Sequence, residues 1–267
     1  MRPSQKLAMA LALSTVAAAP ATAQSSAVIP GANVNMVSGT QWPDGDPFLQ
    51  RQNEPSIAVS TRNRLHLLAG VNDYRTVDLP GLPEGKETGD AWLGVFRSVD
   101  GGGSWKSTLV RGYPQDQEGA YSPLHGYEAA ADPVVRAGTN GLFYYSGIVF
   151  DRSLARSAAF VARFMDLNNE TLDPIRYIDT VLVDSFENGA AFIDKPWLEV
   201  DIPRAGAQTV TLSVPQGSGT VSQTVPCGNM FLAWAEITGL GSALRTRIMF
   251  SRSADCGTTW SDPVPLS

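Results

Sequence analysis

Charged residues recur in this chain at the beginnings and ends of short apolar segments. Three segments open with an acidic residue close to a proline: NEPSIAV at 53–59, ADPVVRA at 131–137 and DKPWLEV at 194–200. Three later segments end in polar residues: NDYR at 72–75, FDR at 150–152 and WAE at 234–236. Carboxylates that are crowded together can have raised pKa values and serve as general acids. Carboxylates, Arg and Tyr around a concave surface also suit a polar ligand such as a sugar.

These positions supply the candidate site residues. The weak candidates for catalysis are Glu54, Asp73, Arg75, Asp132, Asp194 and Glu236. The candidates for ligand binding are Tyr74, Asp151, Arg152 and Lys195. The same residues could instead cap strands and form ion pairs between structural units, which is a common origin of such clusters. The two histidines, His66 and His125, have no metal-ligand spacing, so no metal or cofactor is predicted, although carboxylates and carbonyls could hold Ca²⁺.

Each opening segment is followed by three further short apolar stretches. Second strands are expected at 65–71, 142–150 and 230–235. Third strands are expected at 92–97, 158–164 and 247–250, and fourth strands at 106–111, 175–183 and 263–266. Four short strands per repeat predict an all-β fold of three four-stranded antiparallel β-propeller blades, at 53–127, 128–192 and 193–267. A β-sandwich is the alternative, because short strands and turns also describe that fold.

One eight-residue pattern, S-x-D-x-G-x-[ST]-W, occurs twice, as SVDGGGSW at 98–105 and SADCGTTW at 253–260. Its Ser and Asp can bind backbone N–H groups of a tight turn, its Gly can adopt a positive φ, and its Trp can return to the core. The structural residues expected are Ser98, Asp100, Gly102, Trp105, Ser253, Asp255, Gly257 and Trp260. In the second unit the turn is reduced to MDLNNET, with Asp166 at the Asp position. Antiparallel topology places these turns on one face and the candidate site on the other.

The repeated turn resembles that of the BNR/Asp-box proteins, typified by sialidases, and the resemblance covers about 53–267. It implies a sialidase-like propeller of six blades. A sialidase opens its first blade with R-I-P, whose Arg binds the substrate carboxylate through two bonds. Asn53 stands at that position here and cannot supply a guanidinium group, and the family's Tyr nucleophile falls in later blades.

Two functions remain open after this comparison. The favoured one is a propeller that binds a glycan, a protein or another polar ligand without sialidase machinery, so we expect no turnover of sialosides. The alternative is an exo-acting glycoside hydrolase whose remaining catalytic residues lie in further blades. Three blades would be half of the ring, so we expect the chain not to be a stable monomer by itself, or to pair with a second copy. Residues 32–37 resemble a strand that could close the ring.

The N-terminus carries the features of a signal peptide. Arg2 and Lys6 precede an apolar run of Leu7–Ala19, and Ala21-Thr22-Ala23 is a cleavage site, so 1–23 should be removed and 24–52 should lead into the blades. We therefore expect a secreted or periplasmic protein without a membrane span. The chain has 20 basic and 26 acidic residues and no basic run, which argues against nucleic acid.

The two cysteines, Cys227 and Cys256, are expected to form a disulfide in an oxidising compartment. Cys227 lies just before a second strand and Cys256 lies in the turn after the following third strand. Residues that pair in a simple antiparallel hairpin have a constant sum of residue numbers. With a loop at Gly239–Ser242, the two cysteines should lie nearly opposite each other.

Overall fold

The computed structural model describes residues 33–36, 52–74, 90–114, 116, 121–168 and 173–267. The chain divides into two units, Met1–Asn33 and Val34–Ser267, and the fold below is that of the second. The predicted signal peptide, most of the lead-in and Arg75 lie outside the described residues. A strand was expected at 32–37, but the described residues of this segment, 33–36, form none. Met36 instead packs against Ala69, Val71 and Phe96 of the first sheet.

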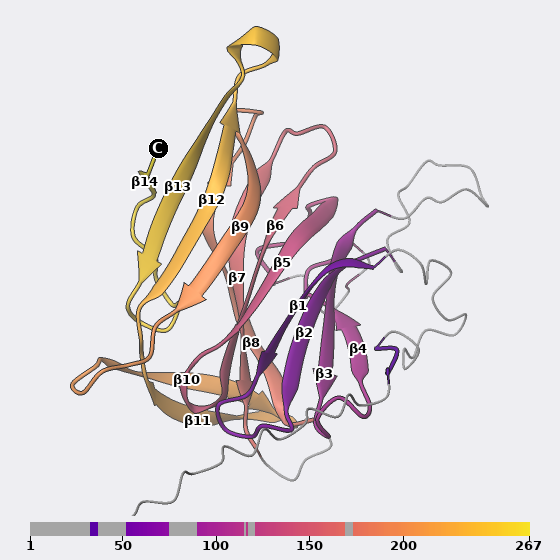
Figure 1. Cartoon of the computed structure of the whole chain (residues 1–267), viewed down its shortest axis with the longest axis vertical. Helices are drawn as coiled ribbons and strands as arrows, with labels where there is room; N and C mark the ends of the chain where they lie inside the picture. Colours follow the sequence, from indigo (N-terminus) through magenta and orange to yellow (C-terminus); the bar gives the residue numbers. More distant parts are fainter. Residues whose placement is uncertain (1–32, 37–51, 75–89, 115, 117–120, 169–172) are drawn as a thin grey trace, which may run out of the picture. The chain divides into compact units, whose positions relative to one another are not determined.

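The second unit contains three four-stranded antiparallel sheets, as the sequence predicts (Figure 1). The first consists of β1 (Asn53–Val59), β2 (Leu67–Asp73), β3 (Trp92–Ser98) and β4 (Lys106–Leu109). The second consists of β5 (Ala129–Ala137), β6 (Leu142–Phe150), β7 (Ser157–Asp166) and β8 (Ile175–Phe186). The third consists of β9 (Phe192–Val200), β12 (Met230–Thr238), β13 (Arg245–Ser253) and β14 (Val264–Pro265). Two short 3-10 turns, η1 (Thr139–Gly141) and η2 (Gly241–Ala243), are the only helical segments in the described ranges.

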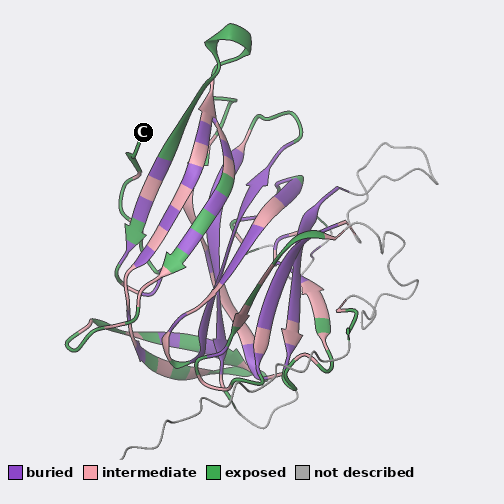
Figure 2. Cartoon of the chain, viewed as in Figure 1, coloured by how far each residue is buried: buried purple, intermediate pink, exposed green. Residues whose placement is uncertain are grey.

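The three sheets are consecutive blades of a β-propeller. The first strand of the middle blade, β5, lies against the first strands of both neighbours, β1 and β9. The middle blade has a neighbour on each face, and accordingly every residue of β6 and β7 is buried (Figure 2). One apolar core lies between the first and second blades and another between the second and third. This explains why the sequences of β6 and β7 are almost continuously apolar and show little alternation.

The third blade carries a hairpin that the sequence analysis did not predict. Strands β10 (Thr209–Gln216) and β11 (Gly219–Pro226) lie between β9 and β12 in the sequence and form their own two-stranded sheet. The turn residue Gly217 has a φ of 58°, which suits a two-residue hairpin loop. The apolar residues Leu212, Val214 and Val225 are buried in the core between the second and third blades. Alternating Val, Leu and Thr residues around a Gly-Ser turn were the available signal.

Each first strand contains a bulge at its opening proline. The pairing of β1 with β2 shifts between Asn53 and Ser56, and that of β5 with β6 shifts between Ala131 and Val134. The residue before each proline has a positive φ: 52° at Glu54, 62° at Asp132 and 47° at Lys195. Proline has no N–H group and cannot donate to the ladder, so the interruption falls at the same place in all three blades. The third blade differs from expectation, because Lys195 and not Asp194 is equivalent to Glu54 and Asp132.

The two octapeptide turns, 98–105 and 253–260, have the same internal hydrogen bonds. Ser98 Oγ accepts a bond from Gly102 N at 2.8 Å, and Ser253 Oγ accepts one from Gly257 N at 3.0 Å. Asp100 accepts bonds from Ser104 N at 2.9 Å and Ser104 Oγ at 2.6 Å. Asp255 accepts the same pair from Thr259 at the same distances. The bonds that the Asp100 carboxylate accepts favour its ionised form and lower its pKa to about 2, chiefly through the bond from the Ser104 hydroxyl.

The reduced turn of the second blade differs from the expected alignment. Asp166 ends β7, as Ser98 ends β3 and Ser253 ends β13, so Asp166 stands at the Ser position and not at the Asp position. It also accepts the bond from the residue two places on, Asn168 N, at 2.8 Å. Its carboxylate further accepts Ser60 Oγ at 2.6 Å and lies 2.9 Å from His66 Nδ1. A carboxylate at this position therefore connects the second blade to the first.

Tyr145 fills the interface between the first two blades. Its ring is fully buried, and its hydroxyl donates to Gly94 O at 2.9 Å. A Cβ atom built on Gly70 would lie 2.5 Å from Tyr145 Oη and 2.6 Å from its ring. Gly70 is thus required by the close approach of a side chain from the next blade, and the hydrogen bond prevents that side chain from moving away.

We predict that Gly70→Ala lowers the free energy of unfolding by about 1–3 kcal/mol, because the new methyl group overpacks a closed interface. Chemical denaturation followed by far-ultraviolet circular dichroism measures the change. The matched control is Gly219→Ala in β11, where an added Cβ would have no neighbour within 4 Å. Equal stability of the two variants would contradict the role assigned to Tyr145.

Cys227 and Cys256 are joined by a disulfide, in agreement with the expected pairing, with a Cα–Cα distance of 5.0 Å. The register of β12 and β13 pairs Met230 with Ser253, which has the same sum of residue numbers as the two cysteines. The bridge holds the octapeptide turn of the third blade to the chain that leaves β11. The same turn is bound from the second blade, because the buried Arg163 donates to Cys256 O at 3.1 Å and to Thr258 Oγ1 at 2.8 Å.

Reduction of this disulfide should lower the free energy of unfolding by about 2–4 kcal/mol, because a long loop in the unfolded chain is released. The cysteines are 29 residues apart in the sequence. Urea titrations with and without reductant measure the effect, with thiol titration to verify reduction. The double variant Cys227→Ala, Cys256→Ala should not respond to reductant. A fully reduced wild-type protein of unchanged stability would refute this prediction.

Candidate functional site

A pocket of about 240 Å³ lies between the first strands of the three blades. We call it the first-strand pocket. It is lined by Glu54, Pro55, Ser56, Asp132, Pro133, Val134, Arg136, Lys195, Pro196 and Trp197. Every blade therefore contributes its opening X-Pro pair, and three of the residues predicted for the site, Glu54, Asp132 and Lys195, come together here.

The three charged residues at the bulges form one cluster. Lys195 Nζ lies 2.6 Å from Glu54 Oε2 and 3.3 Å from Asp132 Oδ1. The backbone N–H of Lys195 also donates to Asp132 Oδ2 at 3.1 Å. The positive φ at all three residues turns equivalent side chains toward one place. A single ammonium group is thus shared by two carboxylates from different blades.

The two carboxylates of the cluster differ in acidity. Burial raises the pKa of Asp132 to about 6, and hydrogen bonding with Glu54 adds to the rise. The hydrogen bond from Lys195 lowers the pKa of Glu54. Partial burial acts against the charge of Lys195, but its bonds to Glu54 and Asp132 prevail and raise the pKa of its ammonium group. Asp132 can therefore carry a proton in mildly acidic solution while Glu54 stays ionised. Acid catalysis by a pair of carboxyl groups requires this difference, with one group protonated and the other charged.

Neutral side chains hold the bulges in position. Asn72 Oδ1 accepts a bond from Asp132 N at 2.8 Å, and Asn72 Nδ2 donates to Asn53 Oδ1 at 2.8 Å. Ser56 Oγ accepts a bond from Val135 N at 2.8 Å. Asn53 thus takes part in an uncharged network that orients the second blade against the first.

Trp197 is the feature that sequence analysis missed. Its side chain borders the first-strand pocket and is 62% exposed, which is unusual for the largest apolar side chain. Arg136 lies over the ring, 5.1 Å from its centroid, and Arg136 Nε is 3.3 Å from Glu199 Oε2. A comparison of the three repeats could have identified it. The residue after the opening proline is Ser56 in the first blade and Val134 in the second, but a large aromatic residue, Trp197, in the third.

The remaining predicted site residues do not line the first-strand pocket. Asp73 is fully buried beside Gly94, and Asp194 lies one position before the equivalent bulge residue. Glu236 is buried and pairs with Arg247 at 2.6 Å. Tyr74 is half-buried at the end of β2, near Arg152. The sequence places these four residues near the ends of the correct strands, but none of them lines the pocket.

Asp151 and Arg152 belong to two ion pairs just after the C-terminal end of β6. Asp151 accepts Arg156 Nε at 2.7 Å and Arg156 Nη2 at 3.0 Å. Arg152 forms a two-bond pair with Asp90, and its backbone N–H donates to Glu128 Oε2 at 2.7 Å. Asp151 thus pairs within the β6–β7 loop, whereas Arg152 pairs with Asp90 just before β3. This arrangement favours a structural role in ion pairs for Asp151 and Arg152 over a role in ligand binding.

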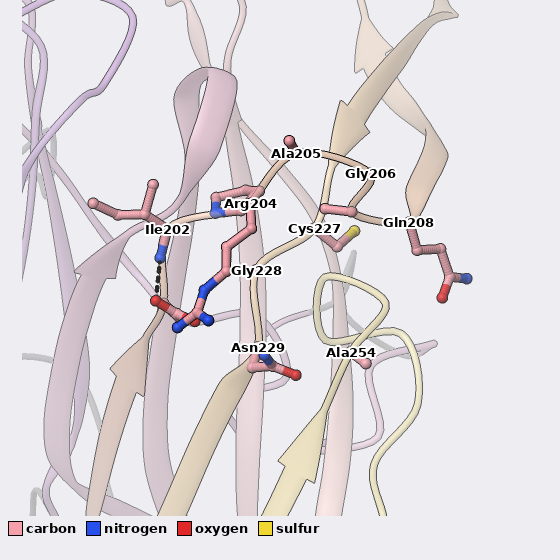
Figure 3. Close-up of a pocket in the computed structure, with 12 residues that line it drawn as sticks. Ile202, Arg204, Ala205, Gly206, Gln208, Cys227, Gly228, Asn229 and Ala254 are labelled. Atoms are coloured by element: carbon pink, nitrogen blue, oxygen red, sulfur yellow. Dashed lines mark hydrogen bonds between the residues drawn. The ribbon is translucent and has the colours of Figure 1, made fainter.

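A second pocket of about 300 Å³ lies beside the disulfide, between the β9–β10 loop and the chain before β12. Figure 3 shows its lining, which consists mostly of backbone and small side chains around Ala205, Gly206 and Gly228. Its charged side chains are Asp201 and Arg204. It brings together no group of acids and no exposed aromatic ring.

No group of three or more potential metal ligands occurs among the described residues. In the first-strand pocket the ammonium group of Lys195 lies where a cation between Glu54 and Asp132 would have to bind. Within the same described ranges, no helix has the length and apolar character needed to cross a membrane.

No protein-family model matches the sequence, and no curated protein matches it. The structure is similar to the GH93 α-L-arabinofuranosidase of Fusarium graminearum in complex with arabinobiose, with 12% identity and a TM-score of 0.45 over 80% of this chain and 48% of that chain. A protein of unknown function from Dyadobacter fermentans is 15% identical, with a TM-score of 0.44 over 80% of this chain and 50% of that chain. A mutant Trypanosoma rangeli sialidase is 12% identical, with a TM-score of 0.34 over 80% of this chain and 37% of that chain. The chain thus spans about half the length of the first two structures it matches.

Proposed function

We propose that this chain binds a saccharide in the first-strand pocket. The observation that carries the proposal is the exposed ring of Trp197 beside a polar cluster formed by three blades. A sugar ring has an apolar face that packs on an aromatic ring and hydroxyl groups that require hydrogen-bond partners at its rim. Glu54 and Asp132 supply acceptors, and Lys195 and Arg136 supply donors.

The pocket volume suits one or two sugar rings at the end of a longer glycan. The side chains that would contact the sugar are already held by bonds within the protein, because the cluster of Glu54, Asp132 and Lys195 is closed and Asn72 fixes the bulge. A site that is formed before binding loses less entropy when its ligand arrives. The proposal therefore does not require a change in backbone conformation.

We further propose that the two octapeptide turns are Asp boxes of the sialidase-like superfamily and that the protein is exported. Their matching internal bonds support the first statement. The disulfide supports the second, because such bonds persist mainly in oxidising compartments.

Trp197→Ala should weaken saccharide binding by at least about tenfold, or about 1.4 kcal/mol, through loss of the stacking surface. A glycan array identifies the ligand, and isothermal titration calorimetry then gives the dissociation constant. Trp197→Phe should retain most of the affinity. The control is Tyr121→Ala, which removes a fully exposed aromatic ring outside the pocket. An array without binding, or equal affinities for Trp197→Ala and the wild type, would refute the proposal and favour a protein ligand.

A glycoside hydrolase is the second candidate, and the raised pKa of Asp132 is the specific observation that favours it. A general acid must be protonated at the working pH, whereas its partner carboxylate must be charged. Asp132 and Glu54 differ in this direction.

If Asp132 is a general acid, kcat/KM for a susceptible glycoside should fall as the pH rises through about 6, where Asp132 loses its proton. Asp132→Asn should then remove turnover, while Asp262→Asn, an exposed acid outside the pocket, should not. A panel of fluorogenic glycosides measures both effects. Sialosides in the panel should remain intact, because Asn53 supplies no guanidinium group. Turnover that Asp132→Asn leaves unchanged would exclude this role for the residue.

A further inference from the structure

A larger cavity, of about 820 Å³, lies between the outer strands of the first and second blades. We call it the arginine cleft because Arg97 of β3, Arg111 after β4 and Arg176 of β8 all line it. The aromatic residues Tyr113 and Tyr177 form part of its wall. None of these residues belongs to the first-strand pocket.

Two of the three guanidinium groups keep donors without partners among the described residues. Arg97 Nη1 donates to Asp173 Oδ2 at 2.9 Å and to Ile175 O at 3.2 Å, but the buried Arg97 Nε has no acceptor in the described part of the chain. Arg176 Nε is likewise buried without an acceptor there, and Arg176 forms no ion pair with any described residue. A buried donor that loses its bond to water and gains no other bond destabilises the folded state. The guanidinium groups of Arg97 and Arg176 therefore keep hydrogen-bonding capacity that the described residues do not use.

The charges in the cleft also favour an incoming anion. Among the described residues its lining includes three arginines and two acids, Asp173 and Asp116. One acid is bonded to Arg97, and Asp116 accepts a bond from Gly112 N at 2.9 Å. Burial lowers the pKa of Arg97, and the nearby charges of Arg176 and Arg111 lower it further against the opposing effect of Asp173. Repulsion among the arginines would be relieved by negative charge placed between them.

The size and walls of the cleft indicate what carries that charge. The volume far exceeds that of a single inorganic ion. Arg111 lies over the ring of Tyr177 at 6.0 Å, so one guanidinium group is oriented by an aromatic face. Arginine binds oxyanions through paired, parallel hydrogen bonds. Tyr rings and hydroxyls can contact the body of a small polar molecule while the arginines hold its anionic group.

We propose that the arginine cleft binds a small molecule through an oxyanion group, such as the sulfate of a sulfated saccharide, held by Arg97, Arg111 and Arg176. The oxyanion accepts hydrogen bonds from the guanidinium groups of these three arginines. The aromatic wall contacts the remainder of the ligand. The ligand enters between two blades, whereas the first-strand pocket is formed by three.

The test is calorimetric titration of the purified protein with a sulfated disaccharide, its unsulfated parent and sodium sulfate, all at the same ionic strength. The sulfated disaccharide should bind saturably and the unsulfated parent should bind at least about tenfold more weakly, because charge-assisted bonds are lost. Arg176→Gln should weaken binding of the sulfated disaccharide by a similar factor. This variant should fold normally, because Arg176 has no ion pair to lose among the described residues.

The matched control is Arg252→Gln, which removes an exposed arginine of β13 outside the cleft and should leave the dissociation constant unchanged. If sodium sulfate binds as tightly as the disaccharide and also depends on Arg176, the site recognises the free oxyanion, and the proposal stands for the group itself. Absence of saturable binding by both sulfate-containing ligands would overturn the proposal. Equal weakening by Arg252→Gln and Arg176→Gln would also overturn it, because it would show attraction to the overall charge.

Discussion

The interruption of each first strand at its opening proline is the constraint on which the arrangement of the blades depends. Proline leaves the ladder without a donor, and the residue before it adopts a positive φ. The N–H groups freed beside the interruption are bound by side chains of the preceding blade: Asn72 accepts from Asp132 N, and Asp132 accepts from Lys195 N. A local irregularity within each sheet therefore becomes the connection between sheets.

The same interruption creates the first-strand pocket. Because equivalent residues of three blades turn toward one place, a carboxylate, a second carboxylate and an ammonium group meet without any long-range pairing of strands. Asp132 both connects two blades and forms part of the pocket. Its Oδ2 accepts a bond from the backbone N–H of Lys195 in the next blade, and its Oδ1 faces the ammonium group of Lys195. Its burial, which favours the protonated form, follows from this double role.

Features that depend on local sequence could be predicted, and features that depend on blade packing could not. The four strands of each blade, the octapeptide turns and the disulfide follow from patterns within one hairpin or one repeat. Whether Asp73 faces the pocket or the interior depends on where the bulge falls, and that depends on contacts with the next blade. Lys195 displaced Asp194 from the predicted position for the same reason.

The arginine cleft could not be predicted from the sequence, and the hairpin was missed although its sequence carries a signal. Arg97 and Arg176 come from separate blades, and nothing in either strand records the presence of the other. The β10–β11 hairpin has a clear alternation, but it interrupts the four-strand repeat on which the prediction rested. Trp197 was placed on the correct strand, yet its exposure depends on the register after the bulge.

The β10–β11 hairpin also changes how the third blade is attached to the other two. It leaves the third blade but packs on β8 of the second, and its residues bond to earlier blades: Arg62 Nη2 donates to Gln223 Oε1 at 2.9 Å, and Thr139 Oγ1 donates to Pro226 O at 2.6 Å. In repeat proteins each unit normally contacts only its neighbours, so one unit can unfold with little effect on distant ones. Here the third blade reaches past the second to the first. Unfolding of the third blade must break contacts with both, which joins the three blades into one cooperative unit of unfolding.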